Sequence, residues 1–250
     1  MSKKYSKSYE VQYEHVDYTL KCKITSIMNF LCDIGNSQSE EVGDTIERLV
    51  EKDKCVWVFY KYDIKINKYP KYRDIITIET QSIGFKKFYA YRGYTIKSSE
   101  GEVLGEAVAL FFFISIARRR PVRIPEEKYE LYGEDKNNPR DVEMEDVMKV
   151  EEVSNEKQFQ IRYSDIDSNG HVNNVKYVEI ALEAVPLEIM KDYTLTRTKI
   201  IFEKETKYGD VVTILTEVKE EKDNEIKTIH LIKSNDGREL TKLEMDWKKK

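Results

Sequence analysis

Long apolar runs are absent from this sequence of 250 residues. The longest, residues 107–116, is too short for a membrane-spanning helix, which needs about 20 apolar residues, so we expect no membrane span. No apolar segment follows residues 1–5 either, so we expect no signal peptide. The three cysteines, Cys22, Cys32 and Cys55, lack metal-ligand spacing. This favours free thiols in a reducing compartment, and therefore a cytoplasmic location.

Histidine, glycine and proline are also scarce. The three histidines, His15, His171 and His230, lack the paired spacing of zinc ligands, and no glycine-rich phosphate loop is present. We therefore expect no metal and no organic cofactor. Ten glycines and five prolines argue against extensive disorder, and a net charge of −4 gives no reason to expect nucleic-acid binding.

The apolar pattern that is present predicts alternating helix and strands. Apolar residues recur at spacings of three and four from Ile24 to Ile34, which predicts an amphipathic helix through about Ser37, with Asn36 and Gly43 as plausible stops. A short strand over residues 9–13 is expected to precede this helix. Four strands are expected to follow, at residues 55–66, 74–83, 86–97 and 103–116.

The same order of elements recurs in the second half. A strand ending near Tyr163 and a helix from Val175 to Val185 precede four expected strands, at residues 194–204, 210–219, 226–233 and 239–247. We infer an internal duplication, with repeats at residues 1–132 and 150–250 joined by an acidic linker at 133–149. Each long helix must hide its apolar stripe, so we expect an α+β fold in which a curved antiparallel sheet wraps each helix. Two separate α+β domains with an ordinary interface are the alternative.

A polar turn between a strand and a helix of the second repeat is the most reactive part of the sequence. Asp167, Asn169 and His171 are spaced two apart, so in an extended segment their side chains would point to one side. Asn173 and Asn174 follow where the helix begins, and unpaired N–H groups at a helix N-terminus can hold a developing oxyanion. The structural alternative is that these side chains only satisfy backbone groups and cap the helix.

This turn is suited to acid–base chemistry with water. A carboxylate could take a proton from water, and His171 could orient the reacting groups or carry a proton. No cysteine lies in the second half, and neither Ser164 nor Ser168 stands in a Gly-x-Ser-x-Gly turn, so a local nucleophile is disfavoured. The first repeat keeps Asp17 but has Lys21 in place of His171, so we expect chemistry in the second repeat only.

The stretch from Arg162 to Tyr177 resembles the signature of acyl-[acyl-carrier-protein] thioesterases, plant plastid and bacterial enzymes. Three further segments are similar to that family, at residues 67–74, 119–127 and 201–206. The resemblance implies a tandem (double) hotdog fold. It also implies hydrolysis of fatty acyl-[acyl-carrier-protein], without a cofactor, which releases the fatty acid and terminates chain elongation.

The resemblance also implies roles for single residues. Its catalytic residues correspond here to Asp167, Asn169, His171 and Glu205. The family's cysteine beside the glutamate is Thr206 here, so we expect carboxylate-assisted attack of water rather than a thiol nucleophile. Whether Asp167 or Glu205 is the general base stays open, and the acyl chain is expected in the first repeat.

The implied partner is an acidic acyl carrier protein. Its docking residues would be basic, and the candidates are Arg118, Arg119, Arg120, Arg123, Lys86 and Lys87; an ordinary solvated charge run is the alternative. An acyl-CoA thioesterase of the same fold is the second functional hypothesis, and a non-catalytic acyl-binding hotdog protein is the third. Because a duplicated chain can supply both halves of a paired hotdog, we expect a monomer or a homodimer.

Overall fold

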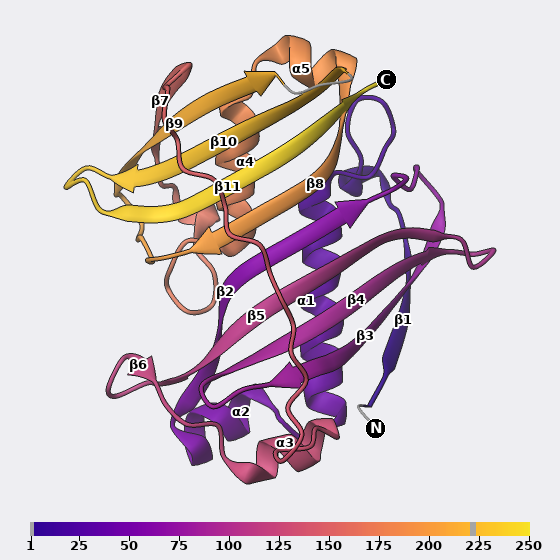
Figure 1. The fold of residues 1–250 in the computed structure, drawn as a ribbon, viewed down its shortest axis with the longest axis vertical. Coiled ribbons are helices and arrows are strands. Elements are labelled where there is room, and N and C mark those ends of the chain that lie inside the picture. The colour runs from indigo at the N-terminus through magenta and orange to yellow at the C-terminus, as the bar shows by residue number, and fades with distance from the viewer. Residues whose placement is uncertain (1–2, 221–223) are drawn as a thin grey trace. The chain divides into compact units, whose positions relative to one another are not determined.

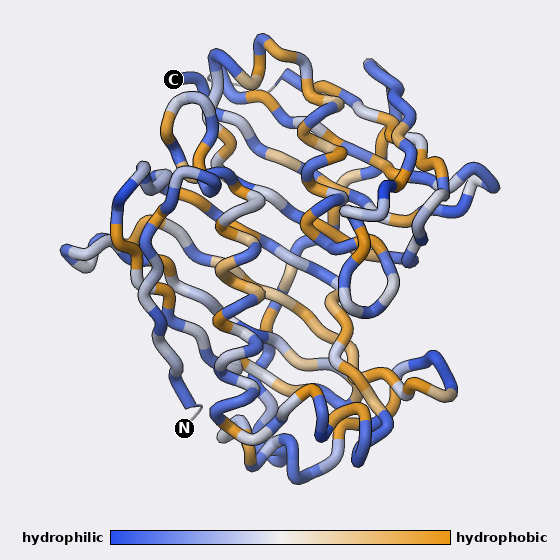
Figure 2. The backbone as a smooth tube through the Cα atoms, turned by 180° about the vertical axis from the view of Figure 1, so that it is seen from behind, coloured by the Kyte–Doolittle hydropathy of each residue, from blue (hydrophilic) through white to orange (hydrophobic). Residues whose placement is uncertain are grey.

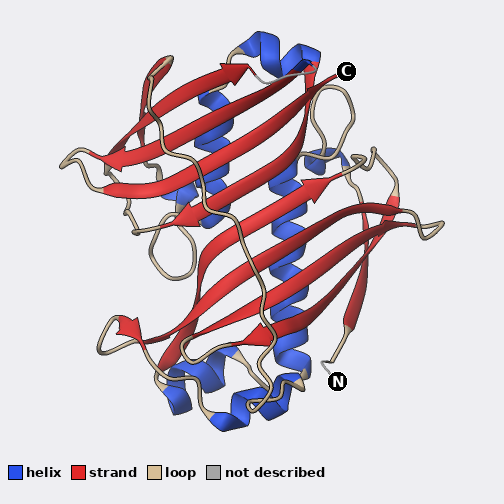
Figure 3. Cartoon of the chain, in the orientation of Figure 1, coloured by secondary structure: helices blue, strands red, loops and turns tan. Residues whose placement is uncertain are grey.

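The computed structural model describes residues 3–220 and 224–250, and the chain divides into two units, Met1–Met144 and Glu145–Lys250. In each unit a long helix lies against one face of an antiparallel sheet (Figures 1 and 3). Within the described ranges, no helix is both long and apolar enough to cross a membrane.

The first unit is built on the helix α1 (Ile24–Glu41). Its sheet has the strand order β1-β3-β4-β5-β2, and every neighbouring pair is antiparallel. The strands are β1 (Tyr5–Glu10), β2 (Cys55–Ile66), β3 (Ile75–Phe85), β4 (Tyr89–Ser98) and β5 (Val103–Ser115), with the short β6 (Arg120–Pro121) paired to β5. Smaller helical elements are η1 (Tyr13–His15), α2 (Ile46–Arg48), η2 (Leu49–Asp53) and α3 (Glu126–Tyr132).

The second unit repeats this plan around α4 (Asn174–Ala184). Its antiparallel sheet has the order β8-β11-β10-β9-β7. The strands are β7 (Asn155–Gln160), β8 (Tyr193–Phe202), β9 (Val211–Glu220), β10 (Glu225–Ser234) and β11 (Glu239–Lys249). A short helix η3 (Tyr163–Asp165) follows β7, and α5 (Leu187–Asp192) precedes β8.

Burial of one face of each element explains the packing. Ile27, Leu31 and Ile34 of α1 are fully buried, as the spacing of three and four requires for a helix lying on a sheet. Along β3 buried and partly exposed residues alternate, because successive side chains of a strand point to opposite faces. Hydrophobic and hydrophilic stretches accordingly alternate along many strands in Figure 2.

The predicted α+β fold of two helix-and-sheet repeats is confirmed, and β2 has the predicted bounds. The helix α1 runs past Ser37 to Glu41 and ends before Gly43, one of the two expected stops, because its buried face extends to Gln38, which is 1% exposed and donates to the Lys3 carbonyl. Two local predictions were wrong. The early strand ends at Glu10, and Tyr13 begins the helical turn η1. Likewise Tyr163 belongs to η3 rather than to a strand.

All three cysteines are free, and Cys22 and Cys55 are buried. Among the described residues no group of three or more metal-binding side chains comes together.

Candidate active site

The polar turn of the second unit is a closed loop, not the extended segment that the spacing suggested. The Asp167 N–H donates to the His171 carbonyl at 2.8 Å, and the Gly170 N–H donates to the Asp167 carbonyl at 3.1 Å. Gly170 has φ +78°, a conformation that glycine adopts readily. The Asp167 carboxylate accepts the Asn169 N–H at 2.8 Å and the His171 N–H at 3.4 Å. Asp167 therefore holds the turn closed with both its backbone and its carboxylate, which bind backbone groups of the turn.

Two contacts fix this turn to its surroundings. The Val172 N–H donates to the Thr206 carbonyl at 3.0 Å, and the Asn173 N–H donates to the Asp165 carbonyl at 2.8 Å. The buried Asp165 carboxylate in turn accepts the Arg162 backbone N–H at 2.8 Å and its guanidinium at 3.0 Å. Burial works against ionisation of Asp165, but the hydrogen bonds from Arg162 outweigh it and lower the pKa of that carboxyl.

The contact between Val172 and Thr206 brings Glu205 to the histidine. His171 Nε2 lies 3.2 Å from Glu205 Oε1, and the two side chains are 25% and 41% exposed. Both groups are thus accessible to water, while the neighbouring Thr206 is buried and its hydroxyl donates to the Asp210 carboxylate at 2.6 Å. Asp167, Asn169, His171 and Glu205 meet at one place of the second unit.

At the start of α4, some of the backbone N–H groups are already bonded within the chain. Asn173 is the N-cap, and its Oδ1 accepts the Val175 N–H at 2.9 Å. The Asn173 side chain therefore caps the helix, as the structural alternative stated. Asn174 is the first residue of the helix, where the positive end of the helix dipole lies.

The first unit contains the same turn without the side chains that could act in catalysis. The Asp17 N–H donates to the Lys21 carbonyl at 2.8 Å, and the Asp17 carboxylate accepts the Thr19 N–H at 2.7 Å. The Cys22 N–H donates to the Pro70 carbonyl at 2.7 Å, as that of Val172 does to Thr206. Tyr69, the residue before Pro70, thus takes the place of Glu205. Residue spacing hides this correspondence in the sequence, because Asp17 and Asp167 are 150 positions apart whereas Pro70 and Thr206 are 136 apart.

The six basic candidates lie on adjacent loops of the first unit. Arg118, Arg119, Arg120 and Arg123 are all exposed, at and after the turn that follows β5. The Ile124 N–H donates to the Lys87 carbonyl at 3.0 Å, which joins this segment to the turn between β3 and β4. Lys86 forms an ion pair with Asp141, so its charge is already compensated.

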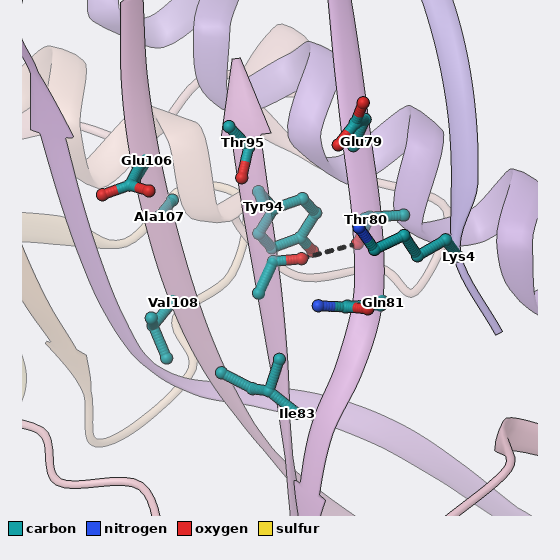
Figure 4. Close-up of a pocket in the computed structure, with 11 residues that line it drawn as sticks. Lys4, Glu79, Thr80, Gln81, Ile83, Tyr94, Thr95, Glu106, Ala107 and Val108 are labelled. Atoms are coloured by element: carbon teal, nitrogen blue, oxygen red, sulfur yellow. Dashed lines mark hydrogen bonds between the residues drawn. The ribbon is translucent and has the colours of Figure 1, made fainter. Parts of the chain in front are cut away.

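A hollow of about 270 Å³ lies elsewhere in the first unit, on β3, β4 and β5 (Figure 4). Its lining mixes charged and polar side chains, Lys4, Glu79, Gln81 and Glu106, with apolar ones such as Ile83 and Val108. None of its lining residues belongs to the candidate site.

The fold and the site define a tandem hotdog protein with a carboxylate–histidine pair at a polar turn. Models of the N-terminal and C-terminal domains of acyl-ACP thioesterases match residues 2–132 and 148–249. The chain therefore belongs to the acyl-ACP thioesterase family, a family of thioester hydrolases.

Curated relatives agree with this assignment, and a solved structure agrees with the fold. A chloroplastic palmitoyl-acyl carrier protein thioesterase of Gossypium hirsutum is 24% identical over 98% of the chain, which spans 64% of that protein. A chloroplastic oleoyl-acyl carrier protein thioesterase 1 of Arabidopsis thaliana is 25% identical over 98% of the chain and 76% of its own length. The crystal structure of a putative oleoyl thioesterase from Lactobacillus plantarum has a TM-score of 0.93 at 24% identity, covering 99% of this chain and 97% of that one.

Proposed function

We propose that this chain hydrolyses the thioester of fatty acyl-[acyl-carrier-protein] by carboxylate-assisted attack of water. The observation that carries this proposal is the approach of Glu205 to His171 at 3.2 Å, beside a turn ordered by Asp167. The pair offers a proton acceptor and a proton carrier that both reach water. Family membership supports the thioester as the bond that is broken.

Of the two carboxylates, Glu205 is the better base. Both Asp167 oxygens face donors of its own turn, since Oδ1 accepts backbone N–H groups and Oδ2 lies 3.4 Å from Asn169 Nδ2. The Asp167 oxygens are therefore already engaged within the turn and are less available to take a proton from water. We assign the base to Glu205, and to Asp167 and Asn169 the task of holding His171 in place.

These groups account for every proton transfer and every bond made or broken in the reaction. Water loses a proton to Glu205 while its oxygen bonds to the thioester carbon, and the carbonyl oxygen becomes an oxyanion near the N-terminus of α4, where Asn174 lies. The oxyanion then collapses, the carbon–sulfur bond breaks, and the proton passes from Glu205 through His171 to the leaving sulfur. The products are a fatty acid and the free thiol of the carrier.

The acyl chain is placed in the first unit, between α1 and its sheet. Support comes from the apolar face of α1, including Ile27 and Leu31, and from Tyr62 and Tyr94 of the sheet, all of which are buried. The carrier is placed on the exposed arginines near β6, where acidic groups of a partner would find opposite charge. A cytoplasmic location remains part of the proposal, consistent with three free cysteines.

One panel of matched acyl-carrier-protein and acyl-CoA thioesters tests the proposal. We expect wild type to hydrolyse the carrier-protein substrates more efficiently, and Glu205→Gln and His171→Ala to lose about 10²-fold or more in kcat on both classes. In the same panel the variant Arg120→Glu/Arg123→Glu should raise KM for the carrier-protein substrates alone.

Unchanged rates in Glu205→Gln and His171→Ala would overturn the site. Equal efficiency on both substrate classes would favour the acyl-CoA thioesterase of the same fold. Saturable binding without turnover of either class would favour an acyl-binding protein.

A further inference from the structure

Tyr177 of α4 carries a hydroxyl to which the mechanism above gives no task. The residue is 2% exposed. Within the described part of the chain, its hydroxyl oxygen is fully buried and has no hydrogen-bond partner of normal geometry. Buried polar groups are rarely left unpaired, because the group loses its hydrogen bonds to water and gains nothing in exchange. The hydroxyl therefore has a cost to the fold that a function would explain.

The surroundings of this hydroxyl belong to the candidate site. The Tyr177 ring meets Phe202 edge-to-face, with ring centres 6.1 Å apart, and Phe202 ends the strand that leads to Glu205. Burial raises the pKa of Tyr177 above its ordinary range, the Thr206 backbone opposes this, and the charges of Glu205 and Asp167 add to it. The phenol therefore stays protonated beside the loop that carries the proposed base, and it can donate a hydrogen bond there.

The first unit shows that packing alone does not require a hydroxyl here. Asn173 and Lys23 are the N-caps of α4 and α1, and Tyr177 and Ile27 each come four residues after their cap. Ile27 is fully buried and apolar. The hydroxyl is thus found in the unit that has Glu205 and is missing from the unit that has Tyr69 in its place.

We propose that Tyr177 is a positioning residue whose hydroxyl accepts the Thr206 N–H and donates to the Glu205 carboxylate during catalysis. Glu205 is 41% exposed and lies 3.2 Å from His171. A carboxylate accepts several hydrogen bonds, so a donor from the protein interior would fix its orientation further. The inference rests on the proposed function and gives its base a defined orientation.

The first test is the pH profile of Tyr177→Phe, which removes only the hydroxyl. We expect kcat to fall about 10- to 100-fold with little change in KM, because a hydrogen bond to a charged group is lost. The acid limb of the profile should move to higher pH, since a carboxylate without its donor has a higher pKa. Tyr132→Phe is the matched control: it removes another buried hydroxyl, which donates to Asp44 in the first unit, and should leave the acid limb in place.

A double-variant comparison separates positioning from general loss of structure. In a Glu205→Gln background, Tyr177→Phe should cause no further loss, because the residue acts through that carboxylate. If Tyr177→Phe is partly unfolded, wild type and variant are compared at a lower temperature at which far-UV circular dichroism shows both to be folded. An unchanged kcat and acid limb, or a loss that adds in full to that of Glu205→Gln, would overturn the inference. Either result would leave the function intact as long as Glu205→Gln and His171→Ala remain inactive.

Discussion

At the scale of single residues, the shape of the site depends on side chains that accept hydrogen bonds from backbone N–H groups and take no part in the reaction. Asp165 accepts the Arg162 N–H at 2.8 Å, three residues before it in the chain. In the first unit His15 Nδ1 accepts the Gln12 N–H at 3.0 Å in the same way. His15 is therefore explained as a turn acceptor, and the acceptor position tolerates either residue type.

The pKa of Asp165 gives a prediction at this scale. The folded-state pKa lies below the unfolded one, so the ionised carboxylate stabilises the fold above about pH 4, and this contribution is lost as the pH falls through the folded pKa. We expect Asp165→Asn to lower the free energy of unfolding by about 1–3 kcal/mol at pH 7, and by less as the pH falls below about 4. Urea unfolding at a series of pH values measures the difference.

The control is Asp236→Asn, because Asp236 pairs with Arg238 while its side chain is 58% exposed. Exposed pairs contribute little, so at pH 7 this variant should lose much less stability than Asp165→Asn. A loss for Asp165→Asn that does not change with pH would mean that its charge is unimportant.

At the scale of elements, the short helix α3 is held by an ion cluster in the interior of the first unit. Lys128 is fully buried and contacts Asp44, and its Nζ lies 2.6 Å from Asp53 Oδ2. Asp44 also accepts the Tyr132 hydroxyl at 2.9 Å and the Trp57 indole N–H at 2.8 Å. Every member thus has partners, which buried charges require.

Removing the cation should leave two carboxylates uncompensated. We expect Lys128→Met to lower the free energy of unfolding by about 3–5 kcal/mol, since breaking a buried pair exposes the cost of the charge left behind. Lys136→Met is the control, because Lys136 pairs with Glu126 at the surface and should cost less than about 1 kcal/mol. Similar losses in the two variants, measured by urea unfolding, would show that the cluster is replaceable.

Elements with a strong apolar pattern were predictable from the sequence, and elements fixed by polar contacts were not. The bounds of β2 followed from its β-branched and aromatic residues. The helix α3 and its Lys128 gave no such signal, because a buried lysine looks like a surface residue until Asp44 and Asp53 are brought to it. Glu205 was found only through the family resemblance, since its approach to His171 depends on a contact between distant segments.

At the scale of the whole molecule, the chain is a duplication whose two halves kept the same turn. Leu20 has φ +61° where Gly170 has φ +78°, so the backbone path is retained even with a residue that rarely adopts it. Lys21 and Tyr69 replace His171 and Glu205. The backbone of the turn is therefore the same in both units, while the side chains proposed for catalysis occur in one. Variants at equivalent positions can separate the contribution to stability from the contribution to activity.

Asp17→Ala and Asp167→Ala form the most direct pair. Each aspartate accepts backbone N–H groups of its own turn, so each variant should lose about 1 kcal/mol of stability. Turnover of acyl-carrier-protein thioesters should fall about 10²-fold or more in Asp167→Ala, whose turn holds His171 beside Glu205, and stay near wild type in Asp17→Ala. Equal losses of turnover at equal losses of stability would mean that both turns act only through the fold. If both variants lose stability but only Asp167→Ala loses activity, the reaction takes place in the second unit.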